Sequence, residues 1–228
     1  MIAERLEQVR ETIGQAALRA GRTPGDITLV AVSKRQSVTQ IATAVACGQL
    51  AFGENYLQEA QEKIEACPQQ INWHFIGHLQ SNKARLAARL FQVIETVDRL
   101  KTARLLDKEA RSGTGLSILV QVNVGEDPRK SGVAAQQLPG LLEAIHTQTT
   151  LRVEGLMTMP PYNPDPEASR PHFARLRALA EENAARGFFA DTSQVALSMG
   201  MSGDFQVAIE EGATLVRIGT SIFGERTP

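Results

Sequence analysis

The sequence predicts a (β/α)8 barrel with an extra helix at its N-terminus. Eight short runs of apolar and β-branched residues alternate with segments of helical periodicity, the pattern of parallel strands joined by helices. The chain has 228 residues, 43% of them hydrophobic, which suits a barrel forming one domain over 1–228. An open doubly wound sheet is the alternative, but the sequence lacks a glycine-rich dinucleotide fingerprint.

Residues 2–20 are predicted to form the N-terminal helix. Apolar side chains recur there at helical spacing, and charged side chains fill the positions between them. Gly21 follows directly and Pro24 soon after, and both residue types commonly end helices. This helix precedes the strand–helix alternation and is therefore additional to it.

Eight apolar runs are the predicted strands. The first is rich in β-branched residues, and the fifth is the longest. They are expected at 27–33, 51–54, 73–77, 93–97, 117–124, 153–157, 195–198 and 215–218.

The segments between the strands carry apolar residues at helical spacing and are the predicted helices. They are expected at 38–47, 57–66, 82–89, 100–112, 135–146, 166–186 and 204–211. The proline-rich segment 160–166 is predicted to be a loop after the sixth strand and a candidate flap over the barrel mouth. No role is assigned to its residues.

Composition narrows the range of partners and compartments. Lys and Arg number 24 against 25 Asp and Glu, a formal net charge of -1, which argues against nucleic acid or an anionic membrane as partner. Cys47 and Cys67 lack metal-ligand spacing and are interpreted as reduced thiols. The N-terminal residues do not resemble a signal peptide, and no stretch is apolar enough to span a bilayer. We therefore expect a cytoplasmic protein.

Polar residues follow almost every predicted strand at its C-terminal end, where barrels carry their chemistry. Strand ends in contact with water would show the same pattern. These residues are Lys34, Asn55, His78, Asp98, Asn123, Thr158, Ser198 and Thr220.

Lys34 is the candidate for covalent chemistry. It ends the first buried strand, where an amine at the edge of a core loses its proton more easily. A neutral amine can form a Schiff base with an aldehyde. The alternative is a lysine that ends its strand in water.

The loops after the last two strands, 198–204 and 219–221, are rich in glycine and hydroxyl residues. Such loops let backbone N–H groups approach an anion, and a helix expected to start near Ser202 would add its positive end. Barrels frequently bind phosphate at these two loops. The alternative is that Gly200 and Gly203 only shape a turn and Ser202 caps a helix.

Arg217 lies inside the last apolar strand and must be paired there. It could form a structural ion pair or donate to a ligand heteroatom. A Schiff-base lysine, a phosphate cradle and a buried donor together describe a pyridoxal phosphate site. His74 and His78 are too few to hold a metal and are expected in hydrogen-bonding or core roles.

Six stretches in chain order resemble the pyridoxal phosphate homeostasis protein family. The resemblance spans nearly the whole chain, and the stretch 73–83 is its most specific part. The stretches are 31–34, 52–56, 73–83, 155–159, 197–202 and 217–220.

This resemblance implies a barrel like the N-terminal domain of alanine racemase, with pyridoxal phosphate bound to Lys34 as a Schiff base. It implies Arg217 near the pyridine nitrogen and Asn55 and Met157 near the ring. It also implies a phosphate site made by Ser198, Gly200, Gly219 and Thr220. Members are regarded as non-enzymatic proteins that help control the supply of this cofactor and of amino and keto acids.

An amino-acid racemase or decarboxylase is the alternative function. As the resemblance implies, racemases of this fold need a second domain and a tyrosine opposite the lysine, whereas the barrel uses this whole chain. Tyr56 and Tyr162 are the only tyrosines, and neither occupies an obvious acid position in the sequence. A Schiff-base aldolase acting on a sugar phosphate is a third, weaker candidate. We expect a monomer that can pass its cofactor to apo-enzymes.

Overall fold

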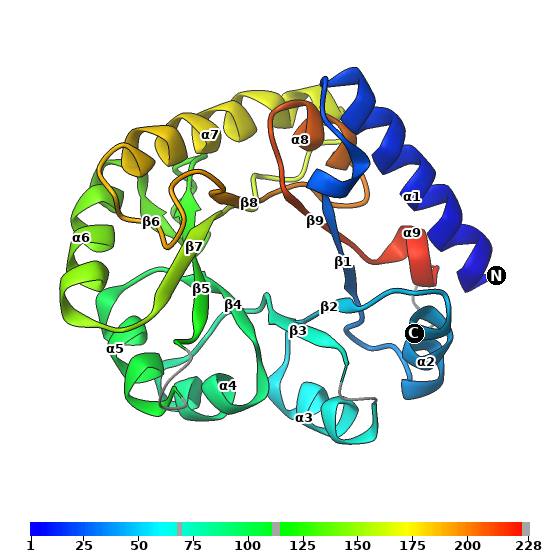
Figure 1. The fold of residues 1–228 in the computed structure, drawn as a ribbon, viewed down its shortest axis with the longest axis horizontal. Coiled ribbons are helices and arrows are strands. Elements are labelled where there is room, and N and C mark those ends of the chain that lie inside the picture. The colour runs from blue at the N-terminus through cyan, green and yellow to red at the C-terminus, as the bar shows by residue number, and fades with distance from the viewer. Residues whose placement is uncertain (68–69, 111–114, 225–228) are drawn as a thin grey trace.

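Eight parallel strands close into a ring in the computed structural model, which describes residues 1–67, 70–110 and 115–224 (Figure 1). Each expected strand is present within two residues of its expected bounds. The strands are β1 (Thr28–Val32), β2 (Ala51–Glu54), β3 (Asn72–Phe75), β4 (Val93–Val97), β5 (Ser117–Asn123), β7 (Arg152–Met157), β8 (Ala196–Ser198) and β9 (Leu215–Ile218). Sequential strands pair around the ring, and the pairing of β9 with β1 closes it.

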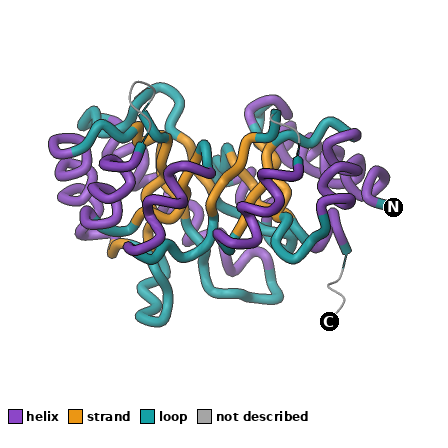
Figure 2. The backbone as a smooth tube through the Cα atoms, turned by 90° about the horizontal axis from the view of Figure 1, so that it is seen from below, coloured by secondary structure: helices purple, strands orange, loops and turns teal. Residues whose placement is uncertain are grey.

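Helices surround the strands on the outside, as the two perpendicular views show (Figures 1 and 2). None of the described helices has the length and apolar content needed to cross a bilayer. The helices are α1 (Ile2–Arg19), α2 (Val38–Ala46), α3 (Leu57–Ala66), α4 (Ala84–Leu90), α5 (Leu100–Glu109), α6 (Leu138–Gln148), α7 (Arg170–Ala184), α8 (Phe205–Glu210) and α9 (Thr220–Phe223).

Three expected helices begin with a 3-10 turn rather than an α-helical one, at Ser81–Lys83, Ala135–Gln137 and Pro166–Ser169. Such tighter turns are frequent at helix ends, where the first N–H groups lack partners in the helix. Another 3-10 turn, Pro24–Asp26, links α1 to β1. The last two residues of the helix expected at 100–112 lie outside the described residues.

Two short elements were not expected from the sequence. β6 (Val133–Ala134) pairs with the end of β5 in the loop above it, and α9 follows β9 directly. Both are too short to show a periodic pattern. α9 matters for the site, because its first residue, Thr220, stands at the mouth of the barrel.

The additional N-terminal helix covers one side of the barrel. α1 packs against α2, near the start of the barrel sequence, and against α8 and α9, at its end (Figure 1). It therefore lies over the place where the first and last parts of the barrel meet. Its buried face consists of Leu6, Val9, Ile13, Ala16 and Ala17. These are the apolar positions that the helical spacing of the sequence indicates.

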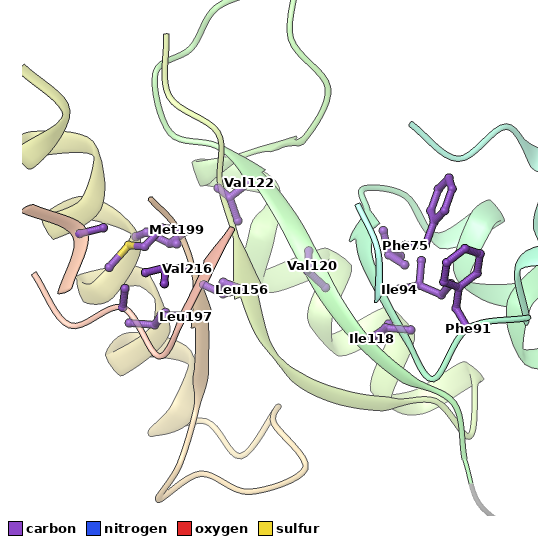
Figure 3. Packing of buried hydrophobic residues seen from close by; sticks show 14 of the residues in the cluster. Phe75, Phe91, Ile94, Ile118, Val120, Val122, Leu156, Leu197, Met199 and Val216 are labelled. Carbon is purple, nitrogen blue, oxygen red and sulfur yellow. The ribbon is translucent and has the colours of Figure 1, made fainter. Parts of the chain in front are cut away.

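The main hydrophobic core lies between the strands and the helices, as Figure 3 shows in part. Ile94, Leu197 and Val216 belong to it, each on a different strand. Their strand neighbours Glu95, Ser198 and Arg217 must face the opposite side, because successive side chains alternate across a strand. The barrel interior therefore contains buried polar side chains.

Candidate functional site

A pocket of about 460 Å³ lies at the C-terminal ends of β1 and β9. Lys34 comes from the turn that follows β1, and Gly219 and Thr220 come directly after β9. The pocket is lined by Val32, Lys34, Pro161, Tyr162, Asn163, Met201, Ser202, Gly203, Asp204, Arg217, Gly219 and Thr220. Parallel pairing of β1 with β9 brings these chain segments together, although they lie far apart in the sequence.

The loop between β8 and α8 forms the wall next to Thr220. The Thr220 hydroxyl donates to Ser202 Oγ at 3.2 Å. The Asp204 carboxylate accepts the Met201 N–H at 2.7 Å and the Ser169 hydroxyl at 2.9 Å. This carboxylate therefore shapes the turn that presents Ser202 and Gly203 to the pocket.

α8 starts at Phe205, one residue after the start expected for the helix 204–211 and three residues after Ser202, near which its positive end was expected. Residues 201–204 form a turn instead, in which the N–H groups of Asp204 and Phe205 both donate to Met201 O, at 3.1 and 2.9 Å. Asp204 is the N-cap residue of α8. An acidic residue thus already occupies the positive end of this helix, which leaves α9 and the loop hydroxyls as the donors closest to the pocket.

Gly200 has a structural reason to be glycine. Its φ of +91° lies in the left-handed region, and a Cβ there would come within 2.6 Å of Ala208 Cβ and 2.9 Å of Phe205 Cα. The residue lets the loop after β8 lie directly against α8. It is not among the residues that line the pocket.

Arg217 forms the structural ion pair that the sequence left open as one of its two roles, at 3.8 Å from the Glu95 carboxylate. The residue also lines the pocket, and its donation to a ligand stays a prediction. Nη1 donates to the Ser198 hydroxyl oxygen, and Nη2 donates to Thr158 O at 2.8 Å. The ion pair and these bonds hold a cation at 3% exposure, where an unpaired charge would be very costly.

A polar network crosses the barrel interior from Arg217 to His74. The Ser198 hydroxyl donates to Glu95 at 2.5 Å, and His74 Nδ1 lies 2.7 Å from the other Glu95 oxygen. Burial alone would raise the pKa of the Glu95 carboxyl. The hydrogen bond and electrostatic interaction with His74, the positive charge of Arg217 and the Ser198 bond together hold that pKa below its ordinary value. The carboxylate is therefore ionised at neutral pH and balances Arg217.

A second cavity of about 340 Å³ adjoins the first across Tyr162 and Met201, which line both. His78 lines this second cavity. Its Nδ1 is hydrogen-bonded to Ser131 Oγ at 3.2 Å. The expected hydrogen-bonding roles of His74 and His78 are confirmed.

The proline-rich loop lies over the barrel mouth. Pro161, Tyr162 and Asn163 line the first pocket. The Lys130 ammonium donates to Met159 O at 3.0 Å and to Pro160 O at 2.5 Å, which ties the start of this loop to the loop after β5.

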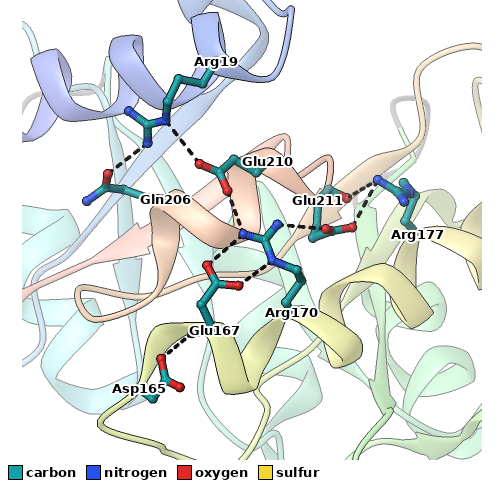
Figure 4. Close-up of polar contacts among 8 residues, drawn as sticks. All are labelled: Arg19, Asp165, Glu167, Arg170, Arg177, Gln206, Glu210 and Glu211. Atoms are coloured by element: carbon teal, nitrogen blue, oxygen red, sulfur yellow. Dashed lines mark hydrogen bonds and ion pairs between the residues drawn. The ribbon is translucent and has the colours of Figure 1, made fainter.

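Ion pairs on the outer surface hold the far end of this loop (Figure 4). Arg170 bridges Glu167 at 2.7 Å, Glu210 at 2.8 Å and Glu211 at 3.0 Å. The turn that ends the loop is thereby linked to the end of α8. A single surface ion pair contributes little to stability, whereas several charges that share one guanidinium form a network.

The eight residues singled out in the sequence divide into two groups. Lys34, Arg217, Gly219 and Thr220 line one pocket. Asn55, Met157, Ser198 and Gly200 do not line it, although each lies at or just beyond the C-terminal end of its strand. Met157 and Ser198 are fully buried register partners. Asn55 has a buried side-chain oxygen without a hydrogen-bond partner among the described residues.

Sequence reasoning missed several pocket residues. Tyr162 and Asn163 belong to a loop without a recognisable motif, and Asp204 is the last residue of the loop 198–204, where its type indicates no binding role. Ser202 and Gly203 lie in the glycine- and hydroxyl-rich loop, so the sequence did contain a signal for them.

Comparison with known proteins places the chain among relatives of the same length. The sequence model of the family "Alanine racemase, N-terminal domain" matches residues 5–227. A protein of Pseudomonas aeruginosa named pyridoxal phosphate homeostasis protein is 45% identical over 227 residues, covering 99% of this chain and 96% of the relative. One of the same name from Escherichia coli is 44% identical over 232 residues, covering 99% and 97%.

Solved structures show the same barrel. PipY of Synechococcus elongatus with pyridoxal phosphate bound has a TM-score of 0.84 and 34% identity, covering 98% of this chain and 100% of PipY. Alanine racemase of Corynebacterium glutamicum has a TM-score of 0.73 at 18% identity, which shows a likeness of fold alone. The match covers 99% of this chain but 61% of the racemase.

Proposed function

Because the chain belongs to the pyridoxal phosphate homeostasis protein family, we propose that it binds pyridoxal phosphate and helps control its supply in the cell. In this role it contributes to vitamin B6 and to amino and keto acid homeostasis without turning over amino acids. It acts in the cytoplasm as a monomer formed by one domain, and apo-enzymes that need the cofactor are its partners.

The observation that carries this proposal is the meeting of Lys34 with Gly219 and Thr220 in one pocket. The Lys34 amine follows β1, and Gly219 and Thr220, the proposed phosphate donors, follow β9. These two strands are paired side by side in the sheet. The pocket volume, about 460 Å³, lies in the range of small-ligand sites. The groups present thus fit a small aldehyde that carries a phosphate.

Pyridoxal phosphate supplies, when bound, an aldehyde with which a lysine amine condenses as water leaves. In this proposal Lys34 holds the cofactor covalently. Thr220, Gly219 and the loop that contains Ser198 and Gly200 bind its phosphate. We add Ser202 to this proposed set, because its hydroxyl is bonded to that of Thr220.

Arg217 is proposed to face the ring nitrogen, with Asn55 and Met157 near the ring. The Glu95 pair keeps the guanidinium in place at the pocket wall. Arginine does not release its proton, so it can donate a hydrogen bond to the nitrogen but cannot protonate it. A ring left unprotonated withdraws electrons less strongly, but Arg217 alone does not decide between holding the cofactor and catalysis.

Replacing Thr220 by alanine is expected to weaken binding of pyridoxal phosphate about tenfold or more. A hydrogen bond to a charged group contributes about 1.5–3 kcal/mol, and the substitution also frees Ser202 from its partner. Binding of unphosphorylated pyridoxal should change far less. Equilibrium titration of both ligands measures this, with Thr147→Ala, an exposed threonine on α6, as control. Equal losses for both ligands would place the phosphate elsewhere.

A racemase-like activity is the second candidate, and one observation favours it. Tyr162 lines the pocket that contains Lys34, so a phenol does stand near the candidate lysine, contrary to what its place in the sequence suggested. It is 86% exposed, however, and lies on a loop rather than on a strand end. A rigid and desolvated acid, as two-base chemistry needs, is not formed by this side chain.

Solvent deuterium exchange at the α-carbon distinguishes the two functions. With a panel of L- and D-amino acids, the loaded protein should exchange near background, because losing one positioned acid or base typically costs 10²–10⁴-fold. In parallel, the loaded protein should restore activity to an added apo-enzyme. Enzyme-like exchange on any amino acid, lost in both Lys34→Ala and Tyr162→Phe, would establish the catalyst and refute the carrier.

A further inference from the structure

Lys63 is a buried lysine that the proposed function does not use. It lies on α3 and is 5% exposed. Its ammonium donates to Ser33 O at 2.6 Å, to Glu54 Oε1 at 2.7 Å and to Glu59 Oε1 at 2.6 Å. An ammonium has three donors, so all of them are satisfied, each in a different direction.

These contacts reach both peptide groups that flank Lys34. Ser33 O belongs to the peptide before Lys34, and it accepts from Lys63. The N–H of Arg35 belongs to the peptide after Lys34, and it donates to Glu59 Oε1. Lys63 and Glu59, bonded to each other, thus hold the main chain on either side of the candidate Schiff-base residue.

The same cluster also holds the strand that leads into this turn. The Ser33 hydroxyl donates to Glu54 Oε1 at 2.6 Å, and Glu54 is 0% exposed at the end of β2. Arg35 follows with a φ of 60°, a conformation that a residue with a side chain adopts only when its surroundings require it. The hydrogen bond from the Arg35 N–H to Glu59 is one contact that holds the backbone in this conformation.

A cluster of a buried lysine, the buried Glu54 carboxylate and the partly exposed Glu59 carboxylate is a costly way to join a helix to two strands. Apolar residues of similar volume commonly give equal or better stability, so the ionic groups need another explanation. Their place around the Lys34 turn supplies one. Non-glycine residues in strained conformations and polar clusters gather where a side chain must be aimed accurately.

We propose that Lys63, together with Glu54 and Glu59, is a positioning cluster that fixes the main chain of residues 33–35 and thereby directs the Lys34 amine into the pocket. This inference rests on the proposed function, in which Lys34 binds the cofactor aldehyde. Lys63 is not among the residues that line the pocket and acts through Lys34.

The test compares two ligands that differ at the reacting carbon. Pyridoxal phosphate can bond to Lys34, whereas pyridoxamine phosphate carries an amine there and binds only through its phosphate and ring. In Lys63→Met, the affinity for pyridoxal phosphate should fall about tenfold or more, since hydrogen bonds to charged groups that aim the amine are lost. The affinity for pyridoxamine phosphate should stay within about twofold of wild type.

Two further variants keep the test decisive. Glu59→Ala removes the partner of the Arg35 N–H from a partly exposed position, so it should fold and show the same selective loss to a smaller degree. Gln49→Leu is the matched control. Its buried amide joins β1 to β2 by donating to Leu29 O and Ala51 O, both at 2.7 Å, away from the Lys34 turn, and it should leave both affinities unchanged.

Equal loss of both ligands in Lys63→Met, or a loss in Gln49→Leu as large as in Lys63→Met, would overturn the positioning role. If Lys63→Met does not fold, an unchanged affinity for pyridoxal phosphate in Glu59→Ala overturns it. Failure of the proposed function looks different. In that case the wild-type protein itself forms no borohydride-stable adduct on Lys34, whatever the variants do.

Discussion

Replacing Lys34 by alanine is expected to abolish the covalent cofactor adduct completely while leaving the barrel folded. Among the described residues that line the pocket, Lys34 is the one lysine, so the substitution removes the amine that the proposed site offers to the aldehyde. Lys34 is half-buried and lies beyond the end of β1, so its truncation removes little of the buried surface that stabilises the fold. Weak binding through the phosphate loops should persist.

The measurement has three readouts. The absorbance of the lysine–cofactor adduct is recorded in the wild type and in the variant, borohydride makes the adduct permanent, and mass spectrometry locates it. Lys101→Ala, which removes an exposed lysine from α5, is the matched control and should keep the full signal. A full adduct signal in Lys34→Ala would disprove the assignment of this residue.

Replacing Glu95 by glutamine is expected to destabilise the protein by about 3–5 kcal/mol, the usual cost of removing one partner of a buried ion pair. Glu95 is 0% exposed and faces Arg217 at 3.8 Å, His74 at 2.7 Å and the Ser198 hydroxyl at 2.5 Å. The amide keeps the shape but not the charge, so Arg217 stays buried without its counter-ion.

Chemical denaturation of wild type and variant at neutral pH measures this difference. Glu154→Gln is the matched control, because Glu154 pairs with Arg152 at the surface and should contribute at most about 1 kcal/mol. A cost for Glu95→Gln no larger than that of the control would show that the network is not needed for stability.

The pH dependence of this difference has a definite sign. The folded state lowers the pKa of Glu95 below 4.5, its ordinary value, so folding favours the ionised carboxylate. The advantage of the wild type over Glu95→Gln is therefore complete above about pH 4.5 and shrinks as the pH falls through the lower folded-state pKa. A gap that widened in acid would contradict the ion-pair explanation.

Much of the fold follows from local patterns in the sequence. Each barrel strand is a short apolar run, and the chain must bury such runs against amphipathic helices wherever they lie. The position of Lys34 after β1 and of Gly219 and Thr220 after β9 could be predicted for the same reason. A residue that follows a strand in a parallel barrel stands at the mouth of that barrel.

The partners of buried charges depended on the tertiary structure alone. Glu95 and Ser198 lie 103 positions apart, and only the closure of the ring brings them to 2.5 Å. Likewise, the sequence alone shows Lys63 as one of several charged residues in a predicted helix, and it shows Tyr162 as part of a proline-rich loop. Sequence periodicity determines which residues enter strands and helices, because it reports a local repeat. Which polar groups then meet across the barrel is decided by strand register and closure, which join residues that no local pattern connects.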